Sequence, residues 1–318
     1  MASSCSHRST SLRISLIAAL ALCFTGGCRS SFPELGPAYQ PGQTYELGMD
    51  VSGRERLALI HMPARVRGAS QPLVVMLHGG GGNGAQFMES SGFVEYADEF
   101  GLIAAFPYGT GPFEKSLLTW NAGNCCGRAL DEGVDDVAFI RALVQTLVDS
   151  YGVDPRRVYA AGISNGAMMS YRLACDASDV FRGIAPVAGA LNLSPCRALT
   201  PVSLMAIHGT ADRHVLYDGG APEVRADRRH DRVDTSVSES VGFWVDRNAC
   251  SANARVSVQG TVRHDIYANC REGRTVELFT IDGGTHSWPG GTRGWIGGDE
   301  PSQAISASRL IAEFASRP

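Results

Sequence analysis

The chain has 318 residues, of which 44% are hydrophobic and 19% are charged, and its formal net charge is −4 at pH 7. These values are ordinary for a globular enzyme, and the length suits one large α/β domain or two small ones. Because no excess of basic residues is present, a nucleic-acid-binding function is not expected.

The first 28 residues have the features of an export signal. Arg8 and Arg13 precede an apolar run over residues 14–24 that is too short to span a membrane comfortably, and small residues then lead to Cys28. This arrangement resembles a bacterial lipoprotein signal. We therefore expect residues 1–28 to form a signal peptide, with the protein either lipid-anchored to the cell envelope through Cys28 or secreted without an anchor.

Residues 29–45 are rich in proline, glycine and serine, which predicts a flexible tether. Beyond it, short apolar runs alternate with amphipathic segments, so residues 46–318 are predicted to form one α/β domain with a mostly parallel sheet flanked by helices on both faces. The expected strands are 57–62, 72–78, 102–107, 158–161, 184–187, 202–208 and 276–281. The expected helices are 87–100, 135–151, 167–175, 238–248 and 302–314.

Several charged residues are interpreted as structural. Asp135 and Asp136 stand at the start of an expected helix, where carboxylates interact favourably with the helix dipole, so we interpret both as capping residues. Residues 221–235 are charged and aperiodic, which is typical of a surface excursion. His230 lies within it and is expected to be solvated.

The sequence Gly162-Ile163-Ser164-Asn165-Gly166 stands between an expected strand and an expected helix. A serine on such a sharp turn is held clear of the sheet, next to the N–H groups that begin the helix. The flanking glycines are needed because larger side chains would clash at so tight a bend. The pattern and its position predict the nucleophile elbow of an α/β-hydrolase fold, with Ser164 as the nucleophile.

A serine nucleophile needs a base, and the base needs an acid to orient it. In α/β-hydrolases these follow in the order serine, acid, histidine, on loops after later strands. Asp212 follows the expected strand 202–208, and His286 follows the expected strand 276–281. We predict Asp212 as the acid and His286 as the base. The alternatives are Asp218 and Asp282 for the acid, and His208 and His214 for the base.

The tetrahedral intermediate of such a reaction needs two donors for its oxyanion. The N–H of Asn165 is one by elbow geometry. The other is expected from the loop His78-Gly79-Gly80-Gly81-Gly82, which resembles the oxyanion loop of esterases, and we favour Gly80. His78 is interpreted as a structural residue that holds this loop.

Six cysteines follow the signal region, an even number that suggests disulfides in an exported chain. Cys175 with Cys196 and Cys250 with Cys270 are the economical pairs, because each closes a short loop. Cys125 and Cys126 either bond to each other or take separate partners. The cysteines and histidines lack the spacing of a zinc site, and no metal or cofactor is expected.

Four stretches together resemble the polyhydroxybutyrate depolymerase and feruloyl esterase family, which is similar to carbohydrate esterase family 1. They are LHGGGGNG; WNAGNCCG with GVDDVAFI; YGVDPRRVYAAGISNGAMMSYRLAC; and HGTAD with GGTHSWPGG. The resemblance covers roughly residues 45–318 and implies a serine esterase that uses Ser164, Asp212 and His286. It also implies that Trp120 and Trp288 contact the substrate, with the Cys125-Cys126 segment near the acyl pocket.

These observations predict an exported serine esterase whose partner is a small or polymeric ester, either a polyhydroxyalkanoate oligomer or a feruloyl-type ester. Two other functions stay open. A serine peptidase of the prolyl-oligopeptidase kind shares the elbow and triad, but such enzymes usually carry a gating domain, and no segment here is expected to form one. A non-catalytic binding lipoprotein on a hydrolase scaffold would usually have lost a triad residue.

Overall fold

The computed structural model describes residues 32–317 apart from 67, 225–226, 228–229 and 296. The expected signal peptide and residues 29–31 of the expected tether lie outside the described residues. The rest of the tether packs on the domain: Leu35 is only 5% exposed, and its N–H donates to the Glu46 carbonyl at 2.8 Å. The compact unit therefore begins at Phe32, not at residue 46. The turn-rich composition of this segment concealed its apolar anchors, which include Phe32, Leu35 and Tyr45.

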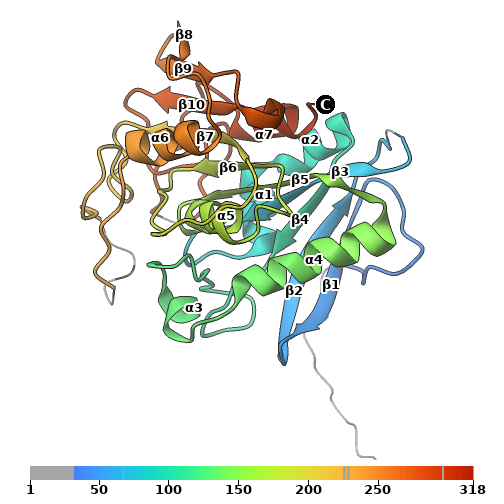
Figure 1. The fold of residues 1–318 in the computed structure, drawn as a ribbon. Helices are drawn as coiled ribbons and strands as arrows, with labels where there is room; N and C mark the ends of the chain where they lie inside the picture. Colours follow the sequence, from blue (N-terminus) through green and yellow to red (C-terminus); the bar gives the residue numbers. More distant parts are fainter. Residues whose placement is uncertain (1–31, 67, 225–226, 228–229, 296, 318) are drawn as a thin grey trace, which may run out of the picture. The chain divides into compact units, whose positions relative to one another are not determined.

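One sheet runs through the domain, with six parallel strands at its centre and antiparallel strands at both edges (Figure 1). Its order is β1 (Gln43–Val51), β2 (Arg54–Met62), β4 (Ile103–Pro107), β3 (Gln71–Leu77), β5 (Val153–Ile163), β6 (Gly183–Val187), β7 (Ser203–Gly209), β10 (Val276–Ile281), β9 (Val262–Tyr267) and β8 (Arg255–Gln259). Strands β3, β4, β6, β7 and β10 are buried at every position, as is typical of strands covered on both faces.

Helices cover both faces of the sheet, as predicted. One apolar cluster joins the sheet to α4 (Asp136–Tyr151), α5 (Asn165–Asp176) and α6 (Val237–Arg247). A second, on the opposite face, joins it to α1 (Gly84–Ser91), α2 (Phe93–Phe100) and α7 (Ala307–Ala315). Short segments α3 (Gly127–Asp131) and η1 (Arg271–Gly273) lie in connections. Within the described residues, none of the helices combines the length and apolarity needed to cross a bilayer.

Some elements differ from the predictions. The expected helix 87–100 is two helices, because Gly92 adopts a left-handed conformation (φ 62°) that ends α1 and precedes α2. The last helix begins at Ala307 rather than at residue 302, with Ser306 as its N-cap. Strands β1, β8 and β9 were not expected.

The two acidic residues at the start of α4 have different roles. The Asp135 carboxylate accepts the Ala138 N–H at 2.9 Å, so it caps the helix as predicted. Asp136 is instead fully buried, where it accepts from Arg56 Nη2 at 2.7 Å and from the Asn121 N–H at 2.8 Å. The interpretation of Asp136 as a cap is therefore wrong, because its partner comes from β2, 80 residues away.

The two economical disulfides are confirmed, since Cys175 is bonded to Cys196 and Cys250 to Cys270. Cys125 and Cys126, which the sequence left open, are bonded to each other.

Candidate active site

Ser164 occupies the turn between β5 and α5 in a backbone conformation (φ 57°, ψ −121°) that non-glycine residues rarely adopt. Such strain is typical of residues that the surrounding fold holds in place for function. The neighbouring glycines are sterically required: a Cβ on Gly162 would lie 2.6 Å from the Leu77 carbonyl oxygen, and one on Gly166 would be closer still. The turn therefore has the geometry of a nucleophile elbow.

Asp212 and His286 meet because the strands that precede them are neighbours. Strands β7 and β10 pair in parallel, so the loops after their carboxyl ends lie side by side. His286 Nδ1 lies 2.8 Å from Asp212 Oδ2, and both residues are buried. Of the three candidate acids, Asp212 is the one hydrogen-bonded to His286 in the described residues; Asp282 instead accepts from the Thr210 hydroxyl at 3.2 Å.

The Asp212 carboxylate is held by both of its oxygens. Oδ1 accepts the N–H groups of His214 and Val215 at 2.8 and 2.9 Å. Oδ2 contacts His286 and lies 3.4 Å from His208 Nε2, whose main acceptor is the Val215 carbonyl at 2.8 Å. Burial opposes the charged form, but the hydrogen bonds from His208 and His286 hold the pKa of Asp212 well below its usual value. The carboxylate is therefore ionised and fixed in orientation.

The two alternative bases lie beside the acid. The ring of His214 stacks on that of His286, with 4.7 Å between centroids, and His208 is buried behind Asp212. His286 is the histidine whose ring nitrogen is hydrogen-bonded to the acid and that also lines the cavity with Ser164.

A cavity of about 1010 Å³ brings the candidate residues together. Ser164, Asn165, His286 and the glycine loop 79–82 all line it. Within the described residues the Ser164 hydroxyl makes no hydrogen bond to His286; catalytic hydrogen bonds of this kind often tighten only when substrate binds.

The glycine loop approaches the elbow closely. A Cβ on Gly80 would lie 3.7 Å from Asn165 Cβ. The Gly81 N–H donates to the Leu118 carbonyl at 2.7 Å, and the Gly82 N–H to the Gly79 carbonyl at 3.1 Å. Among the described residues, the Gly80 N–H has no backbone acceptor, so it is available to a ligand beside Asn165.

His78 holds the loop as a neutral side chain. Its Nε2 accepts the Gly109 N–H at 3.0 Å, so the proton is on Nδ1, which donates to the Gly79 carbonyl at 2.8 Å. Burial lowers the pKa of His78 to about 4, although the hydrogen bond to Gly79 acts in the opposite direction.

This lowered pKa predicts acid sensitivity. Between pH 6.5 and pH 4 the unfolded chain protonates His78 and the folded protein does not, so stability falls as pH decreases. We expect His78 to remove about 3 kcal/mol of unfolding free energy between pH 7 and pH 4. Urea denaturation of the wild type and His78→Gln across this range tests it. Parallel pH curves for the two proteins would contradict the assignment.

The structure separates the two tryptophans that were expected to contact the substrate. Trp288 lines the cavity, where its indole N–H donates to the Ser308 hydroxyl at 2.9 Å. Trp120 does not line it: its ring is 0% exposed, and its indole N–H donates to the His78 carbonyl at 2.9 Å. The side chain of Asn165 clamps the Trp120 backbone at both N–H and carbonyl. The expectation that Trp120 contacts the substrate is therefore wrong, because its buried ring holds the start of the glycine loop and does not line the cavity.

Other cavity residues were not predicted. The apolar wall includes Phe87, which packs edge-on to Trp288, and Trp295, which is half-exposed. The expected surface excursion also reaches the cavity. His230 is only partly exposed, because it contacts two carboxylates, Asp227 at 2.7 Å and Asp131 at 3.0 Å. In the described chain, no group of three or more histidine, cysteine or acidic side chains is arranged to hold a metal ion.

Comparisons with known proteins identify the family of the chain. Residues 57–265 match the family model described as Esterase PHB depolymerase. The chain is 32% identical over 257 residues to the putative esterase NocK of Nocardia uniformis subsp. tsuyamanensis, which covers 76% of this chain and 72% of that protein. It is 31% identical over 241 residues to feruloyl esterase B of Piromyces equi, covering 73% of this chain and 42% of that protein, so it spans less than half of that relative's length.

A solved structure supports the fold. An acetyl xylan esterase from Aspergillus awamori superposes with a TM-score of 0.53 at 16% identity, covering 73% of this chain and 89% of that one. This likeness confirms the predicted α/β-hydrolase fold and concerns the fold alone. The family model spans well over half of the sequence and agrees with the resemblance of its motifs, and the chain therefore belongs to the Esterase PHB depolymerase family.

Proposed function

We propose that the protein is an exported serine esterase that hydrolyses carboxylic esters through an acyl-enzyme. One observation carries this proposal. A strained elbow serine and the histidine of a buried histidine–aspartate pair, built on separate strands, line the same cavity. This is the set of groups that acyl transfer requires, and the family to which the chain belongs is an esterase family.

In this mechanism Ser164 Oγ attacks the ester carbonyl while His286 Nε2 takes its proton. Asp212 holds the Nδ1 proton of His286 and stabilises the imidazolium that forms. Collapse of the tetrahedral intermediate breaks the ester bond, and His286 gives its proton to the leaving alkoxide. Water then attacks the acyl-enzyme, with His286 again accepting a proton, and carboxylate and free Ser164 are released.

The oxyanion of each intermediate would be bound by two backbone N–H groups. Asn165 begins α5, so its N–H is not used within the helix. Gly80 lies beside it on the glycine loop. Donors fixed before the reaction stabilise the developing charge without reorganisation.

The aromatic lining of the cavity favours an acyl group with a flat or extended apolar part. Phe87, Trp288 and Trp295 offer aromatic surface in the same cavity that the glycine loop lines. Such a wall suits a hydroxycinnamoyl ring or an alkyl chain. We therefore propose feruloyl-type esters or polyhydroxyalkanoate oligomers as substrates, in line with the names of the family model and of the feruloyl esterase relative.

Export is proposed on two grounds. Residues 1–28 have signal-like features, and the two disulfides that close short loops favour an oxidising compartment. Anchoring through a lipid on Cys28 is part of this proposal, with free secretion as its alternative. Mass spectrometry of the protein from membranes, looking for a diacylated Cys28 peptide, distinguishes the two.

The function is tested with purified protein and p-nitrophenyl butyrate, methyl ferulate and a poly(3-hydroxybutyrate) suspension. A fluorophosphonate probe, followed by peptide mass spectrometry, identifies the reactive residue. We expect ester cleavage and labelling at Ser164. Faster turnover of a peptide amide would favour the peptidase function, and folded protein with neither hydrolysis nor labelling would favour a binding protein.

A further inference from the structure

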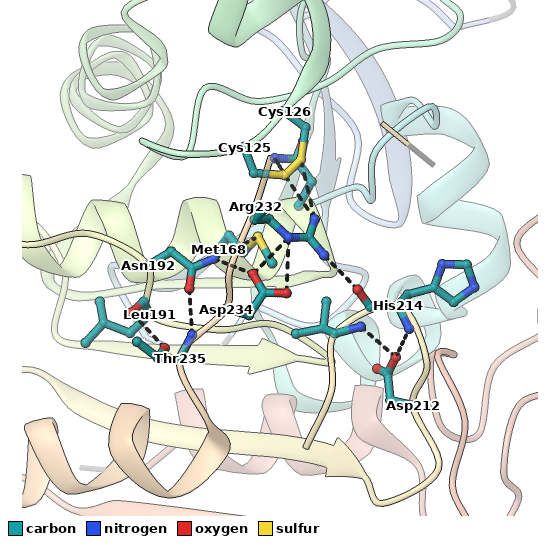
Figure 2. Close-up of polar contacts among 12 residues, drawn as sticks. Cys125, Cys126, Met168, Leu191, Asn192, Asp212, His214, Arg232, Asp234 and Thr235 are labelled. Atoms are coloured by element: carbon teal, nitrogen blue, oxygen red, sulfur yellow. Dashed lines mark hydrogen bonds and ion pairs between the residues drawn. A yellow bond between two sulfur atoms is a disulfide. The ribbon is translucent and has the colours of Figure 1, made fainter. Parts of the chain in front are cut away.

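Arg232 lies where three parts of the site meet, as Figure 2 shows. It comes from the segment that follows the described residue His230, and its side chain is mostly buried. The guanidinium donates to the His214 carbonyl at 2.6 Å and to Cys125 Sγ at 3.5 Å. Its Nε lies 2.8 Å from Asp234 Oδ1, so all edges of the planar group are in use.

Through His214, Arg232 is linked to both Asp212 and His286. The N–H of His214 donates to Asp212 Oδ1, and its ring stacks on His286. A shift of the His214 backbone would therefore move both the N–H that holds Asp212 Oδ1 and the ring that stacks on His286. Arg232 fixes the carbonyl of that same residue.

Through Cys125, Arg232 is also linked to the residue that follows the nucleophile. Asn165 Nδ2 lies 3.7 Å from the same sulfur and also donates to the Trp120 carbonyl. Asn165 directly follows Ser164 at the elbow. The Cys125–Cys126 disulfide, which Figure 2 shows beside Arg232, thus links Arg232 to the residue that follows the nucleophile.

Arg232 is itself held in place. Asp234 has no exposed side-chain surface, and it accepts from Asn192 Nδ2 at 2.6 Å. Asn192 in turn accepts the Thr235 N–H at 3.1 Å. Because the Asp234 carboxylate is buried and accepts hydrogen bonds from both Asn192 and Arg232, the arginine side chain has little freedom to rotate away.

We propose that Arg232 is a positioning residue, which ties the loop that carries Asp212 and His214, and through His214 the ring of His286, to the disulfide beside the nucleophile elbow and so sets the alignment of His286 with Ser164. This inference rests on the proposed esterase function. An arginine that only lined the cavity would affect the binding of large substrates. One that positions the base affects turnover of every substrate, because misplacement by about 1 Å costs up to about 100-fold in rate.

The test uses two variants that keep the fold. Arg232→Met/Asp234→Asn removes both charges, so no buried carboxylate is left unpaired. Arg232→Lys keeps a charge for Asp234 but cannot bridge three partners. The matched control is Arg213→Met. Arg213 lies in the same connection between β7 and α6 as Arg232, and it pairs with the exposed Glu223. Circular dichroism and thermal melting establish folding before kinetics.

With p-nitrophenyl acetate, whose acyl group is too small to reach the cavity walls, we expect kcat to fall about 10- to 100-fold in both variants. KM should stay within about 3-fold, and fluorophosphonate labelling of Ser164 should slow in parallel with kcat. Arg213→Met should behave as the wild type.

Three results would overturn the inference. One is an unchanged kcat in the folded double variant, and another is full activity of Arg232→Lys, which would show that charge alone suffices. The third is a raised KM with kcat retained, which would indicate a binding wall. In each of these the wild type is active, whereas an inactive wild type would overturn the proposed function and this inference with it.

Discussion

Replacement of Asp212 by asparagine is expected to lower kcat for ester hydrolysis by about 10⁴-fold while the protein stays folded. The side-chain oxygen of the introduced asparagine can still accept the N–H groups of His214 and Val215, so the loop keeps its anchors. Its amide group, however, faces His286 Nδ1 as a donor. The ring must then carry its proton on Nε2, where it cannot accept a proton from Ser164.

The measurement is kcat with p-nitrophenyl butyrate for Asp212→Asn, Ser164→Ala and the control Asp282→Asn. Asp282 was an alternative acid, and its carboxylate contacts Thr210 instead of His286. We expect Asp212→Asn to approach the residual rate of Ser164→Ala and the control to keep wild-type activity. Loss of activity in Asp282→Asn with retention in Asp212→Asn would reverse the assignment of the acid.

The central sheet could be predicted because its strands are buried on both faces. Such strands read as continuous apolar runs, and β3 and β7 are buried at all seven positions. Edge strands lack this signal. All five residues of β8 are exposed, and its pairing with β9 depends on a tight turn rather than on an apolar pattern. Likewise, Gly92 was compatible with a helix in sequence, and only its left-handed conformation divides α1 from α2.

The residues of the candidate site were predictable where they follow strands directly. Ser164, Asp212 and His286 each lie within five residues of a strand end, and parallel pairing brings those ends to one edge. Arg232 carries no such signal. It lies 107 residues from Cys125, on an aperiodic segment, and its role depends on contacts that form only when distant loops meet. Trp120 shows a different limit of sequence analysis. A motif can indicate that a residue lies near the site, but it does not tell whether the ring faces the cavity or the core.

Replacement of Arg56 by methionine is expected to lower the unfolding free energy by about 3–5 kcal/mol. The Arg56 guanidinium lies 2.7 Å from Asp136 and 3.9 Å from the centre of the Phe139 ring, and the two charged side chains are 5% and 0% exposed. Burial raises the pKa of Asp136, and Arg56 opposes that shift. Without the arginine, a carboxylate that also holds the Asn121 N–H would be left in the core without its ion-pair partner.

Arg54 provides the matched control. It lies two positions earlier on β2 and forms an ion pair with Glu132 at 2.8 Å, but those side chains are 46% and 29% exposed. Water screens such a pair, so Arg54→Met should cost at most about 1 kcal/mol. Urea denaturation at pH 7 with the disulfides intact measures the unfolding free energies of both variants.

The double variant Arg56→Met/Asp136→Asn should recover part of the loss, since it removes the unpaired charge while the new amide oxygen can still accept the Asn121 N–H. Equal costs for Arg54→Met and Arg56→Met would show that burial of the Arg56–Asp136 pair does not stabilise the connection between β2 and α4 as argued.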